Sequence, residues 1–183
     1  MDTSILKSNL IHEFKRLKEM TEKAVAQVSD DDFFKSIDKE NNSIAITIKH
    51  IAGNMRSRWR DFLTSDGEKP DRYRDNEFII DKEDSRVALM KRWEEGWKFL
   101  FEAIEPLTDK DSEAIVYIRK EEFIVIKAIN RQLSHYAYHV GQIVQLTKHF
   151  CGSDWQTLSI PRGESETFNA KTKKYLADKM NDK

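Results

Sequence analysis

Apolar side chains recur at steps of three and four residues in four long segments of the chain, with Lys, Glu and Arg between them. This spacing gathers the apolar side chains on one face of an α-helix. It predicts helices over residues 4–28, 44–63, 84–104 and 124–150. Because each apolar face must be buried against the others, the pattern predicts an all-α four-helix bundle. We expect residues 1–183 to form a single domain, since no Gly/Pro/Ser-rich linker divides them.

Two connections in the first half of the chain have distinct patterns. Asp30–Asp32 and Asn41–Ser43 bracket a predicted loop, and Ser43 is suited to cap the second helix. Residues 64–83 form a long irregular connection between the second and third helices, and connections of this length are uncommon unless they have a role. It is either a lid over a site or a crossover fixed to the bundle by apolar anchors, which are Tyr73, Phe78, Ile79 and Ile80.

Residues 113–123 differ from the helical segments because they are rich in β-branched and aromatic side chains. They predict a short β-hairpin before the fourth helix, with its turn at Arg119–Glu122. After the fourth helix, residues 155–169 contain Pro161-Arg162-Gly163 and are expected to form a loop. The Lys-rich end of the chain is expected to be a short helix.

The composition agrees with long helices and excludes several classes of partner. Only 6 Gly and 3 Pro occur in 183 residues, and 34% of the residues are charged. A formal net charge of -1 gives no global attraction to nucleic acid or to an acidic membrane surface. The single Cys151 cannot form an internal disulfide, and neither a signal peptide nor a membrane-spanning apolar run is evident. We therefore expect a cytoplasmic protein.

His135 and His139 are the strongest chemical signal, because four residues along a helix place both imidazoles on one face within reach of one metal ion. On a helical wheel they share an arc with Gln132 and Gln142, beside the main apolar face. His50 has a similar half-inward position on the second helix. Three imidazoles leave coordination positions open, as in a catalytic metal site.

The alternative is that these histidines are ordinary helix residues, hydrogen-bonded to Gln132, Gln142 and backbone carbonyls. Burying a polar group without a partner costs about 1 to 3 kcal/mol, so matching polar stripes on two helices favour a bound cation. Tyr136 stands where a zincin protease needs glutamate, which excludes that class. A di-iron bundle is excluded because no Glu-x-x-His pairs accompany these histidines.

Several polar residues near the histidines are candidate contacts to substrate or to the metal ligands. Asn54 and Arg58 follow His50 by one and two turns, and Gln132 and Gln142 flank the histidine pair. Arginines also cluster around Trp59 and Tyr73. They form either an anion-binding patch or a solvated face of salt bridges, and their members are Arg56, Arg58, Arg60, Arg72 and Arg74.

His50 together with His135-x-x-x-His139-x-x-Gln142 resembles the DinB/YfiT-like superfamily of four-helix metalloproteins, over most of the chain. Residues 50–59, 61–70 and 158–163 resemble, more narrowly, a bacterial branch known only as a domain of unknown function. The resemblance implies a four-helix bundle, often a homodimer, with one nickel or zinc ion on three histidines. It also implies enzymes that transfer a low-molecular-weight thiol to an electrophile.

These observations lead to two hypotheses. The first is a metal-dependent enzyme in which a metal-activated thiol or water attacks a small-molecule substrate. The second is a noncatalytic bundle whose metal or polar pocket serves ligand binding or assembly.

Overall fold

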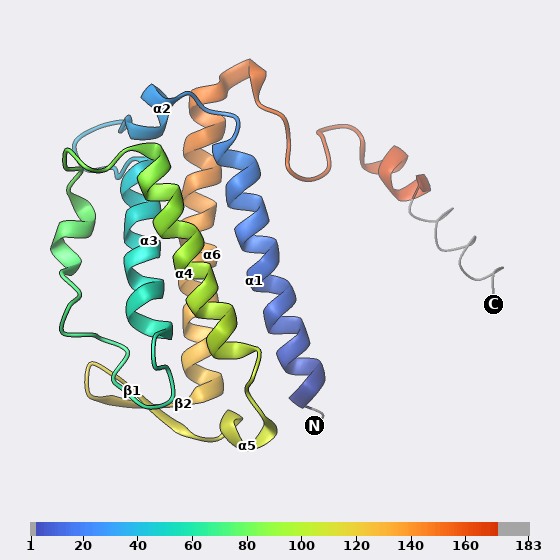
Figure 1. Cartoon of the computed structure of the whole chain (residues 1–183). Coiled ribbons are helices and arrows are strands. Elements are labelled where there is room, and N and C mark those ends of the chain that lie inside the picture. The colour runs from blue at the N-terminus through green and yellow to red at the C-terminus, as the bar shows by residue number, and fades with distance from the viewer. Residues whose placement is uncertain (1–2, 172–183) are drawn as a thin grey trace.

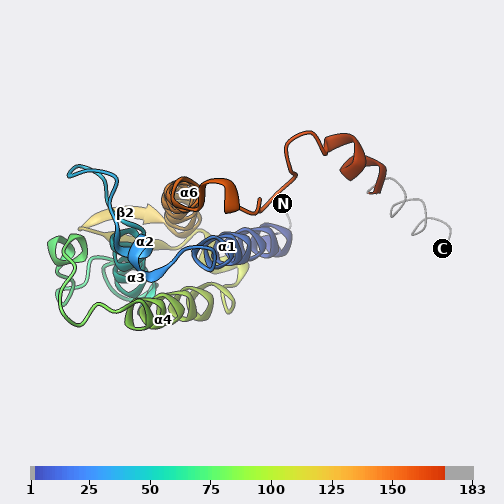
Figure 2. The same cartoon turned by 90° about the horizontal axis from the view of Figure 1, so that it is seen from above.

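Four long helices form the body of the protein (Figure 1). The structure is a computed structural model and describes residues 3–171. Viewed from above, the four helices surround one core, and the C-terminal segment leaves it beyond α6 (Figure 2). The predicted helical bundle with a short hairpin is confirmed, and its long helices are α1 (Thr3–Val25), α3 (Ile44–Trp59), α4 (Arg86–Ile104) and α6 (Val125–Cys151).

The predicted start of α3 is confirmed, but its predicted end was wrong. Ser43 caps the first turn as predicted, since its hydroxyl accepts a hydrogen bond from the Ile46 N–H at 3.1 Å. At the other end the helix stops at Trp59, four residues before the predicted end. Arg60 adopts an extended conformation and Asp61 has a φ of 51°, so the chain turns out of the helix into the long connection.

Short helices occupy the connections between the long helices, including two that the sequence predicted to be irregular. The acidic segment after α1 is the helix α2 (Asp30–Phe34), because Ser29 caps it and Phe33 is buried. The 64–83 connection contains the 3-10 helix η1 (Arg74–Phe78), and α4 is followed by the single turn α5 (Asp109–Ser112). A second 3-10 turn, η2 (Gly152–Asp154), ends α6.

The predicted hairpin is formed by β1 (Ile115–Ile118) and β2 (Glu121–Ile124), which pair antiparallel with Ile118 opposite Glu121. Its turn is therefore Arg119-Lys120 alone, and the predicted four-residue turn was too wide. Both turn residues have positive φ, 57° and 66°, as a tight two-residue hairpin turn requires. The Asp66 carboxylate accepts hydrogen bonds from both of their backbone N–H groups, at 2.9 and 2.7 Å.

The core between the long helices is centred on packed aromatic rings. Phe14 of α1 contacts Trp59, Trp97 and Tyr136, with ring centroids 6.1 to 6.3 Å apart. The Tyr136 hydroxyl accepts a hydrogen bond from Trp59 Nε1 and donates one to Asn54 Oδ1, each at 3.0 Å. The Tyr136 side chain thus ties α6 to α3 within this core.

The segment after α6 only partly follows the prediction. Residues 155–164 are irregular, but residues 165–171 are helical, so the predicted loop ends earlier than Asn169. Gly163, with a φ of 82°, reverses the backbone just before this helix. The Lys-rich end beyond residue 171 lies outside the described residues. Among residues 3–171, no helix is long and apolar enough to span a bilayer.

Candidate metal centre

Three histidines from two helices meet beside the core. His50 comes from α3, and His135 and His139 come from α6. One ligand atom of each lies within 4.8 Å of the others. The Nε2 atoms of His50 and His135 are 3.4 Å apart, and those of His135 and His139 are 3.1 Å apart. Nitrogens bound to one zinc at its usual bond length stand about 3 Å apart, so the three imidazoles can hold one metal ion.

The outer ring nitrogens of two histidines are occupied by acceptors. His50 Nδ1 donates to Glu77 Oε2 at 2.9 Å, and His139 Nδ1 donates to Gln142 Oε1 at 2.8 Å. When such a ring is neutral and carries its proton on Nδ1, its Nε2 lone pair is directed toward the centre, as in known metal-binding histidines. In that form the Nε2 lone pairs of His50 and His139 are both free to bind a cation, with His135 Nε2 beside them.

The charge state of the α6 histidines suits metal binding. Burial lowers the pKa of His135 to about 3, and neighbouring His139, His50 and Arg72 lower it further in the same direction. Burial also lowers the pKa of His139, although the hydrogen bond with Gln142 opposes that shift. Both rings are therefore neutral at pH 7, which is the form that binds metal ions.

Glu77, on η1, is a site residue that the sequence analysis missed. Its buried carboxylate accepts a hydrogen bond from His50 and two from Arg72, at 2.8 and 2.9 Å. Burial alone would raise the pKa of Glu77, but the hydrogen bonds from His50 and Arg72 outweigh burial and lower it. The carboxylate is thus charged where it contacts His50. No periodic pattern links a residue in a 3-10 turn to a helix 27 residues earlier, so the sequence carried no usable signal.

Close approach of η1 to α3 depends on Gly53. A Cβ atom at this position would lie 2.8 Å from Glu77 Cδ, closer than real contacts allow. Because glycine has no Cβ, the Glu77 carboxylate can reach the histidine from the connection. The next residue, Phe78, places its ring 4.9 Å from the His50 ring.

The 64–83 connection is held mainly by polar contacts. Of the predicted apolar anchors, Tyr73 and Ile79 are exposed, so the prediction was wrong for these two, while Phe78 and Ile80 are half-buried. At the end of the connection, buried Asp84 binds Lys49 of α3 and Arg92 of α4. The connection therefore contributes directly to the site through Glu77 and Phe78.

The four predicted contact residues fall into two groups. Asn54, Arg58 and Gln132 line a cavity of about 280 Å³ beside His50 and His135. Gln142 instead contacts His139. Arg58 is occupied by the Glu68 carboxylate and the Gly67 carbonyl. Gln132 is buried, and within residues 3–171 its carbonyl oxygen has no hydrogen-bond partner.

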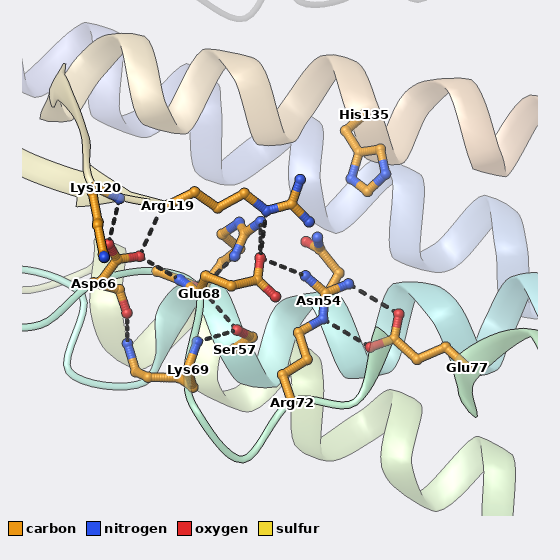
Figure 3. Close-up of polar contacts among 12 residues, drawn as sticks. Asn54, Ser57, Asp66, Glu68, Lys69, Arg72, Glu77, Arg119, Lys120 and His135 are labelled. Atoms are coloured by element: carbon orange, nitrogen blue, oxygen red, sulfur yellow. Dashed lines mark hydrogen bonds and ion pairs between the residues drawn. The ribbon is translucent and has the colours of Figure 1, made fainter. Parts of the chain in front are cut away.

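The predicted arginine cluster splits between surface and interior. Arg56 and Arg60 pair with Asp71 at the surface, as the salt-bridge alternative predicted. Arg58 and Arg72 are instead buried in a network with Glu68 and Glu77. Figure 3 shows Arg72 of this network beside Glu68 and Glu77. Arg119 of the hairpin joins this network by binding Glu68 at 3.0 Å. The participation of the hairpin was not evident from the sequence.

Comparison with known proteins identifies the family of the chain. A family model described as a protein of unknown function, DUF1572, matches residues 3–164. Searches of curated proteins and of solved structures found no match. The predicted resemblance to a domain of unknown function is thereby confirmed. Because the match covers most of the chain, the protein belongs to the DUF1572 family.

Proposed function

We propose that His50, His135 and His139 bind one divalent ion, nickel or zinc, and that the protein is a metal-dependent enzyme. One observation carries this proposal: the three Nε2 atoms converge while the Nδ1 atoms of His50 and His139 are held by outside acceptors. Imidazole nitrogen suits both metals, and neutral rings are the required form.

A catalytic role is favoured over a purely structural one by what surrounds the histidines. Three protein ligands leave at least one coordination position for another molecule. The cavity of about 280 Å³ adjoins His50 and His135, so a small molecule has room beside them. A divalent ion in such a site lowers the pKa of a bound water or thiol and supplies a nucleophile at neutral pH. We propose either transfer of a low-molecular-weight thiol to an electrophile or hydrolysis.

We further propose that the DUF1572 family belongs to the DinB/YfiT-like superfamily. Its support is the combination of one histidine on α3 with a His-x-x-x-His pair on α6 across a helical bundle. This relationship is the source of the thiol-transfer hypothesis and would also imply a homodimer.

Elemental analysis of the purified full chain tests the metal proposal. We expect about one metal ion per chain, lost in His50→Ala, His135→Ala and His139→Ala. His149→Ala is the matched control, because His149 lies exposed on the same helix as two of the ligands. Full metal retention in all three ligand variants would overturn the site.

Reaction assays test the enzyme proposal separately. Small thiols are incubated with an activated aryl halide, and activated esters are supplied for hydrolysis, with metal-loaded and metal-stripped protein. We expect a metal-dependent rate that His135→Ala abolishes. If the metal is bound, neither reaction occurs and chelation sharply lowers the melting temperature, the noncatalytic hypothesis is favoured instead.

A further inference from the structure

The cavity beside the histidines is lined by an unusual concentration of guanidinium groups. They come from α3, the long connection, the hairpin and α6, so four separate parts of the chain converge on a hollow of about 280 Å³. The arginines are Arg58, Arg72, Arg74, Arg119 and Arg131. In Figure 3 the Arg119 side chain extends from the hairpin toward Asn54 and the His135 side of the site.

The carboxylates around this cavity do not balance the arginines. A single oxygen of Glu68 accepts contacts from Arg58, Arg72 and Arg119, at 3.0, 3.5 and 3.0 Å. Glu77 is shared between Arg72 and His50. Asp66 is also half-buried and interacts electrostatically with Arg58. Three buried or half-buried carboxylates therefore face five guanidinium groups, which leaves an excess of positive charge around the hollow.

Two of the arginines have little or no pairing with carboxylates. Among residues 3–171, Arg74 forms an ion pair only with Asp75, at 3.9 Å, and the Asp75 side chain is 99% exposed. Arg131 lies over the Phe123 ring at 5.5 Å and pairs with no carboxylate in the described part of the chain. Uncompensated cations beside a protein cavity favour an anionic ligand, since guanidinium groups bind carboxylate and phosphate through paired hydrogen bonds.

Gln132 provides an independent indication that the cavity takes a ligand. The residue is 4% exposed, yet its side-chain carbonyl oxygen has no hydrogen-bond partner among residues 3–171. An unpaired buried amide costs free energy that a bound molecule can recover. Oxygen and NH2 exchange places when the amide turns by 180°, and in that orientation its NH2 group can donate a hydrogen bond to an anion.

We propose that this cavity binds the anionic group, a carboxylate or a phosphate, of a small substrate. In this proposal Arg119 and Arg131 contact the anion directly. Arg58 and Arg72 are held in place by Glu68 and Glu77, and their charges add to the positive potential in the cavity. The Asp66 carboxylate fixes the hairpin turn by accepting hydrogen bonds from the backbone N–H groups of Arg119 and Lys120. The role of the anion as part of a substrate rests on the proposed metal-dependent function, whereas anion binding itself does not.

Anion titration of the full chain by calorimetry tests this proposal. The probes are inorganic phosphate and succinate, at constant ionic strength with chloride as the balancing anion. Metal-stripped and metal-loaded protein are both titrated, because phosphate can also bind a metal ion. We expect saturable binding of at least one probe to the stripped protein, and the stronger of the two identifies the anion class.

Matched arginine variants locate the binding. Arg119→Gln and Arg131→Gln are each expected to weaken binding about tenfold, the loss of one charge-assisted contact. Arg56→Gln, which removes an exposed arginine outside this cavity, should leave the anion affinity unchanged. No binding by the stripped wild-type protein, or equal weakening in all three variants, would overturn the anion site. Metal content, measured in the same samples, reports separately on the histidine site.

Discussion

The two sides of the histidine centre are built by different means. On the α6 side, Gln142 supports His139 from three residues along the same helix. On the α3 side, Glu77 supports His50 from a connection that begins after the helix has ended. The α6 side is thus complete once one helix forms, whereas the α3 side also requires the 64–83 connection to fold against the bundle.

This difference predicts that the α3 side is the more sensitive to substitution. Glu77 is buried and charged, and it is held by Arg72 as well as His50. Gln142 is exposed, neutral and bound through one hydrogen bond. Substitutions on the two sides can therefore test whether support from outside the helix contributes more than support from within it.

The largest effect is expected where the connection joins α3 and α4. Asp84→Asn removes a buried charge that binds Lys49 and Arg92, and it should lower the free energy of unfolding by about 3 kcal/mol at pH 7. Burial alone would raise the pKa of Asp84, but Lys49, the Asp81 N–H and Arg92 lower it overall. The stabilisation is therefore present above the unfolded-state pKa of about 3.9 and is lost as pH falls through the folded-state pKa.

Urea denaturation at neutral and acidic pH measures this effect. The difference between wild type and Asp84→Asn should shrink on acidification. Asp81→Asn is the control, because Asp81 also binds Lys49 but is 57% exposed and should contribute little. Equal destabilisation by both substitutions would argue against the buried pairing as the anchor.

Glu77→Gln is expected to have the next largest effect, now on metal binding. It removes the negative charge beside His50, and loss of such a partner typically weakens metal binding about 10- to 100-fold. Competition titration with a zinc chelator measures the affinity. Asp75→Asn, also on η1 but fully solvated, should bind metal like the wild type. An unchanged affinity in Glu77→Gln would remove Glu77 from the site.

Gly53→Ala perturbs the same contact without altering any polar group. The added methyl must displace the Glu77 carboxylate, and we expect about a tenfold loss of zinc affinity, the lower limit for losing the contact outright. Gly96→Ala is the matched control, because its methyl would lie 2.8 Å from Met55 Cε, between α3 and α4. That variant should lose about 1 to 3 kcal/mol of stability but keep its metal affinity. If both weaken zinc binding equally, helix packing rather than Glu77 is responsible.

Gln142→Ala should have the smallest effect. A single hydrogen bond of this kind contributes about 1 kcal/mol, so zinc affinity should fall about fivefold. Gln145→Ala, exposed on the same helix, is the control and should have no effect. A loss as large as that in Glu77→Gln would remove the distinction between the two sides.

The same distinction explains how much the sequence could predict. The long helices and the convergence of His50 with His135 and His139 follow from apolar periodicity, because a residue's place on a wheel fixes its direction once the faces pack. Glu77 and Gly53 meet through a 3-10 turn whose position depends on buried ion pairs, and no residue spacing encodes that. The hairpin turn was predicted too wide because Arg119 and Lys120 lack the Asn-Gly signal of a tight turn. Their positive φ values accompany hydrogen bonds that their backbone N–H groups donate to the carboxylate of Asp66, which is distant in sequence.

The Tyr136 hydroxyl has a consequence for the rotational setting of α6. Successive residues of a helix are turned by about 100° around its axis, so a small rotation of α6 would swing both of its histidines away from His50. Tyr136 lies between them in the sequence, with its ring packed on Phe14 and its hydroxyl bonded to Trp59 and Asn54 of α3. These contacts fix the rotation of α6 about its own axis. A residue that points into the core, away from any ion, thereby sets the direction in which the two α6 imidazoles face.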